Sequence, residues 1–518
     1  MTPASTSPVA LLRKVHSSVV AMLAATAASQ PTHAALVDRE RSMDYAQYLA
    51  CVGGFAHELQ GLGAQCERVA TLLGNSIEAC VAQFAALAAG AQLVPLNPLL
   101  TESELAPILR DAEVRVLVVH ASLLPMAGQL AADTGVAHLI VVGAGTRLLD
   151  AWSAGSAVLP ALPQTGTIAL LQYTGGTTGR AKGVELTHAA IATNVAQREA
   201  LLPSQPGERV LCVMPLSHAY GMAMGLFLAV GNCGTLVVLP RYHCDDVFDC
   251  LQRERITVFP GSPTVFVGLM AHPRFAQTDW SRLHTCYSGG AALAAGTLAR
   301  WTEAVGAPIF EGYGMTEAGP VLTFNPACGP VKPGSVGVPV PLTEIEIVDV
   351  ESGCRVLGPG ERGEIRARGP QCMRGYRHLA QESALALRQG WLYTGDIGSI
   401  DGDGYLFIQD RKKDMVIVGG YNVYPREVEE VLFAHPDVVD AAVIGVPDDY
   451  RGERLVAHVV TGPGTRSDAN ALLAWCAQRL AKYKLPAQVR FAAALPKTPA
   501  SKTDKVALRQ SETHAARE

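Results

Sequence analysis

The sequence predicts an α/β protein with a large N-terminal domain of mostly parallel sheets flanked by helices, a small β-rich subdomain, and a small α+β C-terminal domain. Apolar runs of strand length alternate with helical patterns over residues 68–261, which is typical of βαβ units. From about Thr343 the pattern changes to short strands separated by Gly/Pro turns. A new α+β pattern follows the charged run 410–414, and 518 residues are more than one core usually holds.

The parallel sheets are predicted from Val- and Leu-rich runs that are too short to be helices. These runs are residues 68–74, 91–97, 114–120, 138–144, 166–173, 209–216, 234–240 and 256–261. Thr187 is the predicted N-cap of a helix over 188–202, because its hydroxyl can accept a bond from the first helical turn. Residues 15–34 predict an amphipathic helix, since Ser, His and Gln interrupt the apolar run that a secretory signal needs.

The second half of the chain predicts a subdomain and a separate domain. Short strands are expected at 343–349, 363–369 and 404–410. Beyond the charged run, the pattern predicts a helix over 425–436 with Pro425 near its first turn, strands at 439–446 and 453–460, and an amphipathic helix over 468–484. We therefore expect an N-terminal domain over 1–410, whose β-rich subdomain covers about 335–410, and a C-terminal domain over 411–518.

Composition excludes several classes of protein. A net charge of −5 gives no basic surface for nucleic acid, which argues against nucleic acid as the main ligand. The twelve cysteines are scattered without a CxxC pair, which predicts free thiols in a reducing, cytoplasmic compartment. No run of about eighteen apolar residues occurs, so no transmembrane span is expected.

One stretch, "YTGGTTGRAKGVELTH" at 173–188, joins a predicted strand to a predicted helix. Backbone N–H groups and threonine hydroxyls at such a junction can surround a polyphosphate, and Lys182 can neutralise it. The stretch is not a Walker A loop, because Arg180 follows Gly179 and Gly183 follows Lys182. By itself, a loop of this composition is equally compatible with a mobile connection.

Further motifs decide between these two interpretations. "YTGGTTGRAKGV" closely resembles the phosphate loop of the adenylate-forming superfamily, which includes acyl-CoA synthetases, peptide-synthetase adenylation domains and luciferases. Other matches follow in the superfamily's order: "PLSHAYG" (215–221), "YSGGAAL" (287–293), "EGYGMTEAGP" (311–320), "YTGDIG" (393–398), "DRKKDMVIVGGYNVYPREVEE" (410–430) and "LPKTPASKTDKVALR" (495–509). The block "KKDMVIVGGYNVYPREVEE" looks most like that of bacterial fatty acyl-CoA synthetases, whereas "GYGMTEAGPVL" is also similar to aryl-propenoate CoA ligases.

The resemblance implies a two-step reaction with ATP, Mg²⁺ and CoA. A carboxylate attacks the α-phosphorus of ATP to give an acyl adenylate and pyrophosphate, and a thiol then displaces AMP. Both steps place charge on phosphate or carbonyl oxygens, which calls for hydrogen-bond donors, a cation and Mg²⁺.

The resemblance also assigns residues. Phosphate binding falls to Thr174, Gly175, Gly176, Thr177, Thr178, Gly179 and Lys182, and other nucleotide contacts to Gly289, Gly290, Ala291, Glu311, Gly312, Tyr313 (adenine), Asp396 (ribose) and Arg411. Catalytic roles fall to Lys502 (adenylation), Thr316 (α-phosphate), Glu317 (Mg²⁺) and His218 (acyl pocket). The resemblance assigns the thiol tunnel to Gly419, Gly420 and Tyr421, and the hinge of a mobile C-terminal domain to Lys413.

Each of these residues also has a simpler interpretation. A lone histidine like His218 is more often a satisfied core residue, Asp396 is a common turn residue, and the run 410–414 can be solvated charge. Ser501 stands where the superfamily usually has glycine, and it supports the alternative of a catalytically silent nucleotide- or acyl-binding homologue.

The acid and its acceptor are less closely defined. Residues 219–231, "AYGMAMGLFLAVG", are uncharged and predict either an apolar acyl tunnel or a buried core helix. Amino acids are disfavoured, because amino-acid activators of the superfamily place an Asp here to pair the ammonium group, and this region offers Ser217 and His218. Dicarboxylic acids are disfavoured, because residues 219–231 provide no extra Arg or Lys for a second carboxylate. A medium- to long-chain fatty acid is favoured, with an aryl-propenoate CoA ligase or an acyl-AMP ligase that loads a carrier protein as alternatives. Peripheral membrane contact and a homodimer stay open.

Overall fold

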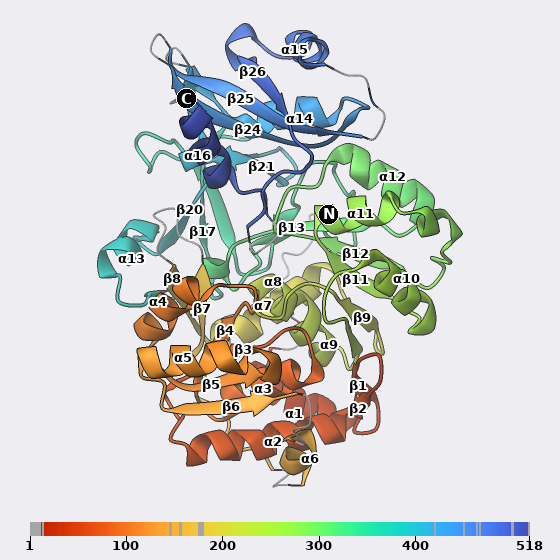
Figure 1. Cartoon of the computed structure of the whole chain (residues 1–518), viewed down its shortest axis with the longest axis vertical. Coiled ribbons are helices and arrows are strands. Elements are labelled where there is room, and N and C mark those ends of the chain that lie inside the picture. Colours follow the sequence, from red (N-terminus) through yellow and green to blue (C-terminus); the bar gives the residue numbers. More distant parts are fainter. Residues whose placement is uncertain are drawn as a thin grey trace, which may run out of the picture.

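The computed structural model describes residues 12, 15–143, 148–154, 158–174, 181–418, 421–448, 451–462, 465, 468–498 and 502–515. Within these residues the strands form four sheets. Figure 1 shows the red and orange N-terminal elements at the bottom, the green elements on the right and the blue C-terminal elements at the top. Helices flank largely parallel sheets in the N-terminal part, so the predicted α/β class is confirmed.

The first sheet carries the strand that leads to the "EGYGMTE" motif. Its order is β15 (Val338–Pro339), β14 (Thr323–Phe324), β13 (Ile309–Tyr313), β12 (Thr285–Ser288), β11 (Val258–Gly261), β9 (Arg209–Cys212), β10 (Thr235–Val238), β1 (Ala34–Val37) and β2 (Ser42–Asp44). The pairs from β1–β10 to β12–β13 are parallel, and β2, β14 and β15 add antiparallel edges. The carboxyl ends of β12 and β13 therefore open on the same side.

The second sheet carries the two ends of the Gly/Thr-rich loop. Its order is β18 (Gly375–Tyr376), β8 (Lys182–Thr187), β7 (Ile168–Thr174), β4 (Gln92–Leu96), β3 (Arg68–Leu72), β5 (Val114–His120) and β6 (His138–Val142). The β7–β4–β3–β5–β6 pairs are parallel, whereas β7–β8 and β8–β18 are antiparallel. The last pairing brings residues 375–376 to a sheet otherwise built from the first 187 residues.

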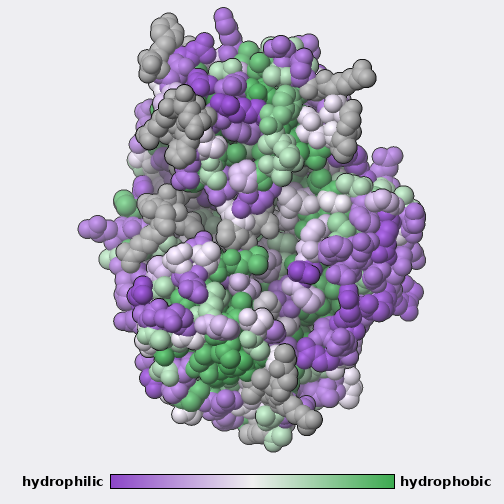
Figure 2. All heavy atoms as spheres, viewed as in Figure 1, coloured by the Kyte–Doolittle hydropathy of each residue, from purple (hydrophilic) through white to green (hydrophobic). Residues whose placement is uncertain are grey.

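Helices pack around these two sheets. They are α1 (Val19–Ser29), α2 (Tyr45–Gly61), α3 (Ile77–Ala88), α4 (Glu102–Ala112), α5 (Leu124–Thr134), α6 (Leu148–Ser153), α7 (His188–Leu201), α10 (Cys244–Arg253), α11 (Pro263–Met270) and α12 (Ala295–Val305). The Thr187 hydroxyl accepts a 3.1 Å bond from the N–H of Ala190, so the predicted N-cap of α7 is confirmed. Figure 2 shows hydrophilic residues covering the right-hand side of the molecule, over α10 and α12.

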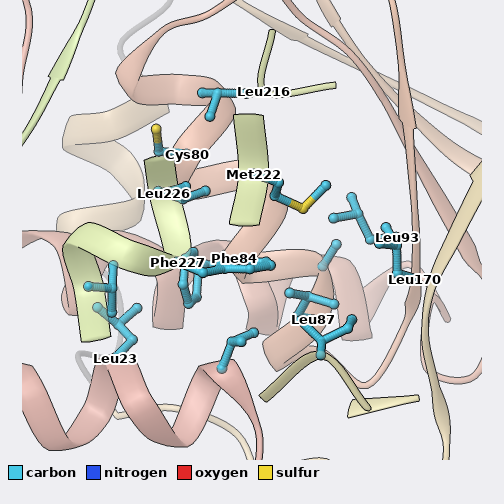
Figure 3. Packing of buried hydrophobic residues seen from close by; sticks show 14 of the residues in the cluster. Leu23, Cys80, Phe84, Leu87, Leu93, Leu170, Leu216, Met222, Leu226 and Phe227 are labelled. Carbon is cyan, nitrogen blue, oxygen red and sulfur yellow. The ribbon is translucent and has the colours of Figure 1, made fainter. Parts of the chain in front are cut away.

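Residues 219–231 form a buried helix with an irregular centre. The helix runs through α8 (Ala219–Gly221), a π-helical segment (Met222–Phe227) and α9 (Leu228–Gly231). Figure 3 shows Met222, Leu226 and Phe227 packed beside Phe84 and other core residues, and the rings of Phe84 and Phe227 lie 5.7 Å apart, edge to face. The core-helix alternative therefore describes this stretch, and the π turn is the departure that a regular pattern did not predict.

The C-terminal half contains the two smaller sheets. The third sheet has the order β16 (Glu344–Val348), β17 (Gly363–Arg368), β20 (Trp391–Ile400) and β19 (Leu387–Arg388), with β21 (Leu406–Arg411) on β20, and α13 (Ala380–Ala386) lies beside it. The fourth has the order β23 (Tyr421–Val423), β22 (Val416–Val418), β25 (Gly452–Thr461) and β24 (Val438–Asp448), with β26 (Gln488–Phe491) on β25. Its helices are α14 (Pro425–Phe433), α15 (Ala469–Ala477) and α16 (Lys505–Ala515).

The predicted helix over 468–484 is wrong in length. The helix α15 ends at Ala477, and a separate short turn covers Lys482–Lys484. The chain changes direction at Ala481, and Leu480 and Tyr483 then pack on the core of the fourth sheet before β26 begins. Tertiary packing thus outweighs the continuous amphipathic pattern.

Candidate active site

The described ends of the Gly/Thr-rich loop stand opposite each other. Thr174 ends β7, Lys182 begins β8, and the two residues pair in the antiparallel register. The residues between them that were predicted to bind phosphate lie outside the described residues: Gly175, Gly176, Thr177, Thr178 and Gly179. The sheet therefore fixes the entry and exit of the loop, with Lys182 at the exit.

Lys182 takes part in a short chain of polar contacts. Its ammonium forms an ion pair with Glu382 of α13 and lies 5.2 Å from the centroid of the Tyr376 ring. The hydroxyl of Tyr376 donates a 2.8 Å hydrogen bond to Oε1 of Glu317. The two side chains assigned to the triphosphate and to Mg²⁺ are thus connected through Tyr376. Neither Tyr376 nor Glu382 was predicted, because only the β8–β18 pairing brings them to Lys182.

Thr316 and Glu317 follow the end of β13 in a short 3₁₀ turn, Thr316–Ala318. The carbonyl of Glu317 accepts a 2.7 Å bond from the N–H of Met373, and the Glu317 side chain is buried. Among the described residues, no group of three or more His, Cys, Asp or Glu side chains could hold a metal ion by itself. A cation at Glu317 would therefore take its other ligands from water, backbone or phosphate oxygens.

Asp396 is the centre of a second polar cluster. Its Oδ2 accepts a 2.6 Å hydrogen bond from the Tyr313 hydroxyl, and its Oδ1 lies 3.1 Å from Nε of Arg411. Asp396 and Arg411 are partners in the β20–β21 register, which explains why they meet. The negative charge of Asp396 raises the pKa of Arg411, and burial raises the pKa of Tyr313 well above its ordinary value. The cluster thus holds a buried carboxylate where β13 and the third sheet meet.

The "YSGG" turn allows close approach of neighbouring groups. A Cβ on Gly289 would lie 2.7 Å from the ring of Tyr220, so only glycine fits there. Gly290 has a φ of +82°, in the left-handed region, and a Cβ there would lie 3.9 Å from Cε of Lys502. Ala291 follows in an exposed position.

Glu311, on β13 just before Gly312, was predicted to contact the nucleotide. Its carboxylate accepts a 2.9 Å bond from the N–H of Leu293, and burial raises its pKa to about 7. A Cβ on Gly312 would lie 2.4 Å from the ring of Phe324. The Glu311 carboxylate thus fixes the loop that follows "YSGG" through the N–H of Leu293.

Lys502 comes from the C-terminal part of the chain and lies close to the "YSGG" turn. Figure 1 shows the dark blue segment before α16 running down toward β13 and β17. The backbone near Lys502 is held by a 2.7 Å bond from the N–H of Thr498 to the Lys502 carbonyl. Lys502 is exposed by surface area, but the protein around its ammonium removes part of its water and lowers its pKa; the charge of Arg411 lowers it further, while Asp396 and Glu317 oppose this shift. The structure therefore brings Lys502 together with the two carboxylates.

His218 lies at the start of α8, close to Lys502. Its Nδ1 accepts a 3.2 Å bond from the N–H of Tyr220, so Nδ1 carries no proton in this arrangement. Burial lowers the pKa of His218 to about 4, with a smaller contribution from the charge of Lys502. The imidazole is therefore neutral at physiological pH. Its bond to Tyr220 also fits the simpler interpretation of a core histidine whose hydrogen bonding is satisfied.

The remaining predicted residues lie on the segment after β21. The backbone of Lys413 belongs to a short turn, Lys412–Asp414, while Gly419, Gly420 and Ser501 lie outside the described residues. Tyr421 begins β23. The neighbouring Lys412 donates a 2.8 Å bond to Glu364, so it is held by the third sheet.

Comparisons with known proteins extend over nearly the whole chain. Residues 23–377 match the family model of the AMP-binding enzyme, and residues 427–502 match that of the AMP-binding enzyme C-terminal domain. The chain belongs to the AMP-binding enzyme family. The predictions of the adenylate-forming superfamily and of an AMP-forming acid–CoA ligase are thereby confirmed.

Individual relatives agree with this family assignment. The chain is 36% identical over 481 residues to a long-chain-fatty-acid–CoA ligase of Bacillus subtilis, covering 86% of each protein. It is 38% identical over 463 residues to a feruloyl-CoA synthase of Amycolatopsis, covering 89% of this chain and 92% of that one. Among solved structures, ATP-bound MatB from Rhodopseudomonas palustris superposes with a TM-score of 0.90 at 32% identity, covering 96% and 98% of the two chains.

Proposed function

We propose that this AMP-binding enzyme activates a medium- to long-chain fatty acid as its acyl adenylate and transfers the acyl group to CoA. The observation that carries the proposal is the position of Lys502, which comes from the C-terminal part of the chain yet lies within the electrostatic reach of Glu317, Asp396 and His218. A cation between a magnesium ligand and a ribose ligand is suited to hold the carboxylate and α-phosphate oxygens together.

The described side chains divide the first step among them. Asp396 would accept hydrogen bonds from the ribose hydroxyls, because its two oxygens are already oriented by Tyr313 and Arg411. Lys182 and Thr174 would bind the β- and γ-phosphates, together with the loop between them, and Thr316 the α-phosphate. The ammonium of Lys502 would stabilise the charge on the oxygens as the carboxylate attacks and pyrophosphate leaves.

Magnesium fits the side chains around Glu317. Mg²⁺ is usually held by one or two carboxylates together with phosphate oxygens and water, and Glu317 offers one buried carboxylate beside Lys182 and Tyr376. When bound, the ion would neutralise charge on the triphosphate. Tyr376 would keep the Glu317 carboxylate in a single orientation.

The second step requires a different arrangement of the C-terminal domain, which we propose spans residues 411–518 with a hinge near Lys413. The thiol of CoA would enter past Gly419, Gly420 and Tyr421 and attack the acyl carbonyl, releasing AMP. The contacts that would open are those across the proposed boundary, including the Lys412–Glu364 pair and the bond from the N–H of Arg426 to Asp410.

The choice of acid is supported by relatives. Several of the similar curated proteins are long-chain-fatty-acid–CoA ligases. The second candidate, an aryl-propenoic acid, is favoured by the likeness to feruloyl-CoA synthase at 38% identity. A carrier protein in place of CoA stays an alternative acceptor, and the free thiols of all twelve cysteines support our proposal of a cytoplasmic location. None of the described helices meets the length and hydropathy needed to cross a bilayer.

The proposal is tested by ATP–pyrophosphate exchange with octanoate, palmitate, oleate, cinnamate and ferulate, repeated with CoA while loss of free thiol is followed. We expect exchange and thiol loss with the fatty acids, at kcat/KM values at least tenfold above those with the aryl acids. The reverse order would replace the fatty acid by an aryl-propenoate. Exchange without thiol loss would favour a carrier protein, and no exchange with any acid would contradict an active ligase.

A further inference from the structure

The pair formed by Lys182 and Glu382 has a consequence for nucleotide binding. Lys182 is the described cation of the phosphate loop, and its ammonium already contacts a carboxylate. A carboxylate and a phosphate are alternative anionic partners for one ammonium group. We propose that Glu382 is an internal competitor of the triphosphate: it holds Lys182 until the β- and γ-phosphates of ATP take its place. This inference rests on the proposed phosphate-binding role of Lys182.

The position of Glu382 is fixed by its surroundings. The strand β18 pairs with β8, which places Gly375 opposite Glu185 and Tyr376 opposite Val184. The N–H of Arg377 donates a 2.8 Å bond to the Gly183 carbonyl, directly beside Lys182. The segment that leads to α13 is therefore bonded to the strand that starts with the phosphate-binding lysine.

A serine ties the helix to this strand. The Ser383 hydroxyl accepts a 2.8 Å bond from the N–H of Tyr376 and donates a 2.8 Å bond to the Leu379 carbonyl. Because Ser383 follows Glu382, the glutamate is anchored next to β18 rather than carried on a loose loop. Its side chain is 36% exposed and that of Lys182 is 20% exposed, but Oε2, the oxygen that meets the ammonium, is itself buried, so a solute anion can take its place only as the Glu382 side chain turns away.

The ring of Tyr376 contacts Lys182 whether the partner of the lysine is Glu382 or the triphosphate. It faces the Lys182 ammonium at 5.2 Å, and this contact does not depend on which anion is the partner. Its hydroxyl meanwhile orients Glu317. When the triphosphate displaces Glu382, Lys182 therefore keeps its position over the ring, and only the anion is exchanged.

The direct test is equilibrium binding of MgATP and of AMP to the full-length chain, without acid or CoA, by titration calorimetry. We expect Glu382→Gln to tighten ATP binding roughly three- to fivefold, since the amide removes a competing charge of a partly exposed pair. AMP binding should be unchanged, because AMP lacks the phosphates assigned to Lys182. The matched control is Asp246→Asn, which removes the carboxylate of the remote Arg39–Asp246 pair, also 36% exposed. The control should leave both affinities as in the wild type.

Two further variants separate this inference from the proposed function. Lys182→Gln should weaken ATP relative to AMP, and Glu382→Gln should have no additional effect in the Lys182→Gln background. If Lys182→Gln leaves ATP binding intact, the phosphate role of Lys182 is wrong. If that role holds but Glu382→Gln leaves ATP binding unchanged, weakens it, or tightens it equally without Lys182, the competition is overturned. Glu382→Ala must give the same answer as Glu382→Gln, and a change in the opposite direction would also contradict the proposal.

Discussion

The ammonium of Lys182 lies against the carboxylate of Glu382, whereas the ammonium of Lys502 lies near His218 and Arg411. Lys182 thus has an anionic partner within the protein. The surroundings of Lys502 instead lower its pKa, chiefly because the protein around its ammonium removes part of its water. The same type of side chain is held in two electrostatic states. Lys182 must exchange Glu382 for another anion when substrate binds, whereas the ammonium of Lys502 is stabilised by the anion that arrives.

The largest effect is expected at Lys502, whose ammonium lies within electrostatic reach of Glu317 and Asp396. Lys502→Ala should lower acid-dependent ATP–pyrophosphate exchange by about 100-fold or more, because a preorganised donor is lost where charge develops. Lys497→Ala is the control, since Lys497 lies on the same segment but its ammonium contacts Asp440 at 2.7 Å and Thr503 at 3.0 Å. An exchange rate within tenfold of wild type would remove Lys502 from the adenylation step.

The ribose cluster should show the next largest effect. Asp396→Asn weakens the acceptor of the Tyr313 hydrogen bond and leaves Arg411 without its charge partner, which we expect to cost about 1.5–3 kcal/mol, or roughly 10- to 100-fold in kcat/KM for ATP. AMP affinity should fall by a similar factor, because AMP carries the same ribose. Asp403→Asn changes an exposed carboxylate paired with Lys332 and serves as the control. Unchanged AMP binding in Asp396→Asn would contradict the ribose assignment.

The lowered pKa of Lys502 predicts an alkaline limit. The ammonium form is present below the Lys502 pKa and is lost above it, so the exchange rate should fall about tenfold per pH unit once the pH exceeds that lowered pKa. His218 stays neutral above its pKa of about 4 and should add no inflection between pH 6 and 8. Lys502→Arg should move the alkaline limit upward in whatever activity it retains. A limit that stays in place would assign it to another group.

The smallest effect is expected at the residue that joins the triphosphate side chains. Tyr376→Phe removes the bond to Glu317 and keeps the ring under Lys182, so the loss should be about 1 kcal/mol, or roughly fivefold in KM for MgATP. The KM for the acid should not change. Tyr405→Phe, which loses a 3.0 Å bond to the Pro330 carbonyl, is the matched control. Equal changes in the two KM values would indicate a general structural defect.

Sequence reasoning was most successful where a residue's neighbours are close in the chain or fixed by a motif. The N-cap at Thr187 and the helix starting at Pro425 are local features, and both are present. The residues Asp396 and Lys502 were predicted from motifs, and the structure brings them near each other although their sites of action stay predictions.

Features that depend on distant pairing were missed. Glu382 has an ordinary helical context, and nothing in its neighbours indicates that it meets Lys182. The π turn at Met222–Phe227 also escaped, because uniformly apolar sequence carries no periodicity from which an extra residue in a turn could be detected. The helix predicted to reach 484 failed for a related reason, since the packing of Leu480 and Tyr483 is decided by the sheet they cover.

The pairing of β18 with β8 also bears on how the protein matures. Val184 and Tyr376 are adjacent in the sheet but about 190 residues apart in the chain, and contacts of such long range slow folding. During synthesis, the strand that begins with Lys182 leaves the ribosome long before the tyrosine that completes its edge. The nascent chain would therefore carry an uncovered strand edge for many seconds at ordinary elongation rates of about 5–20 residues per second. The strand edge beside the proposed phosphate-binding lysine is thus completed late in translation, after residues 375–376 have emerged.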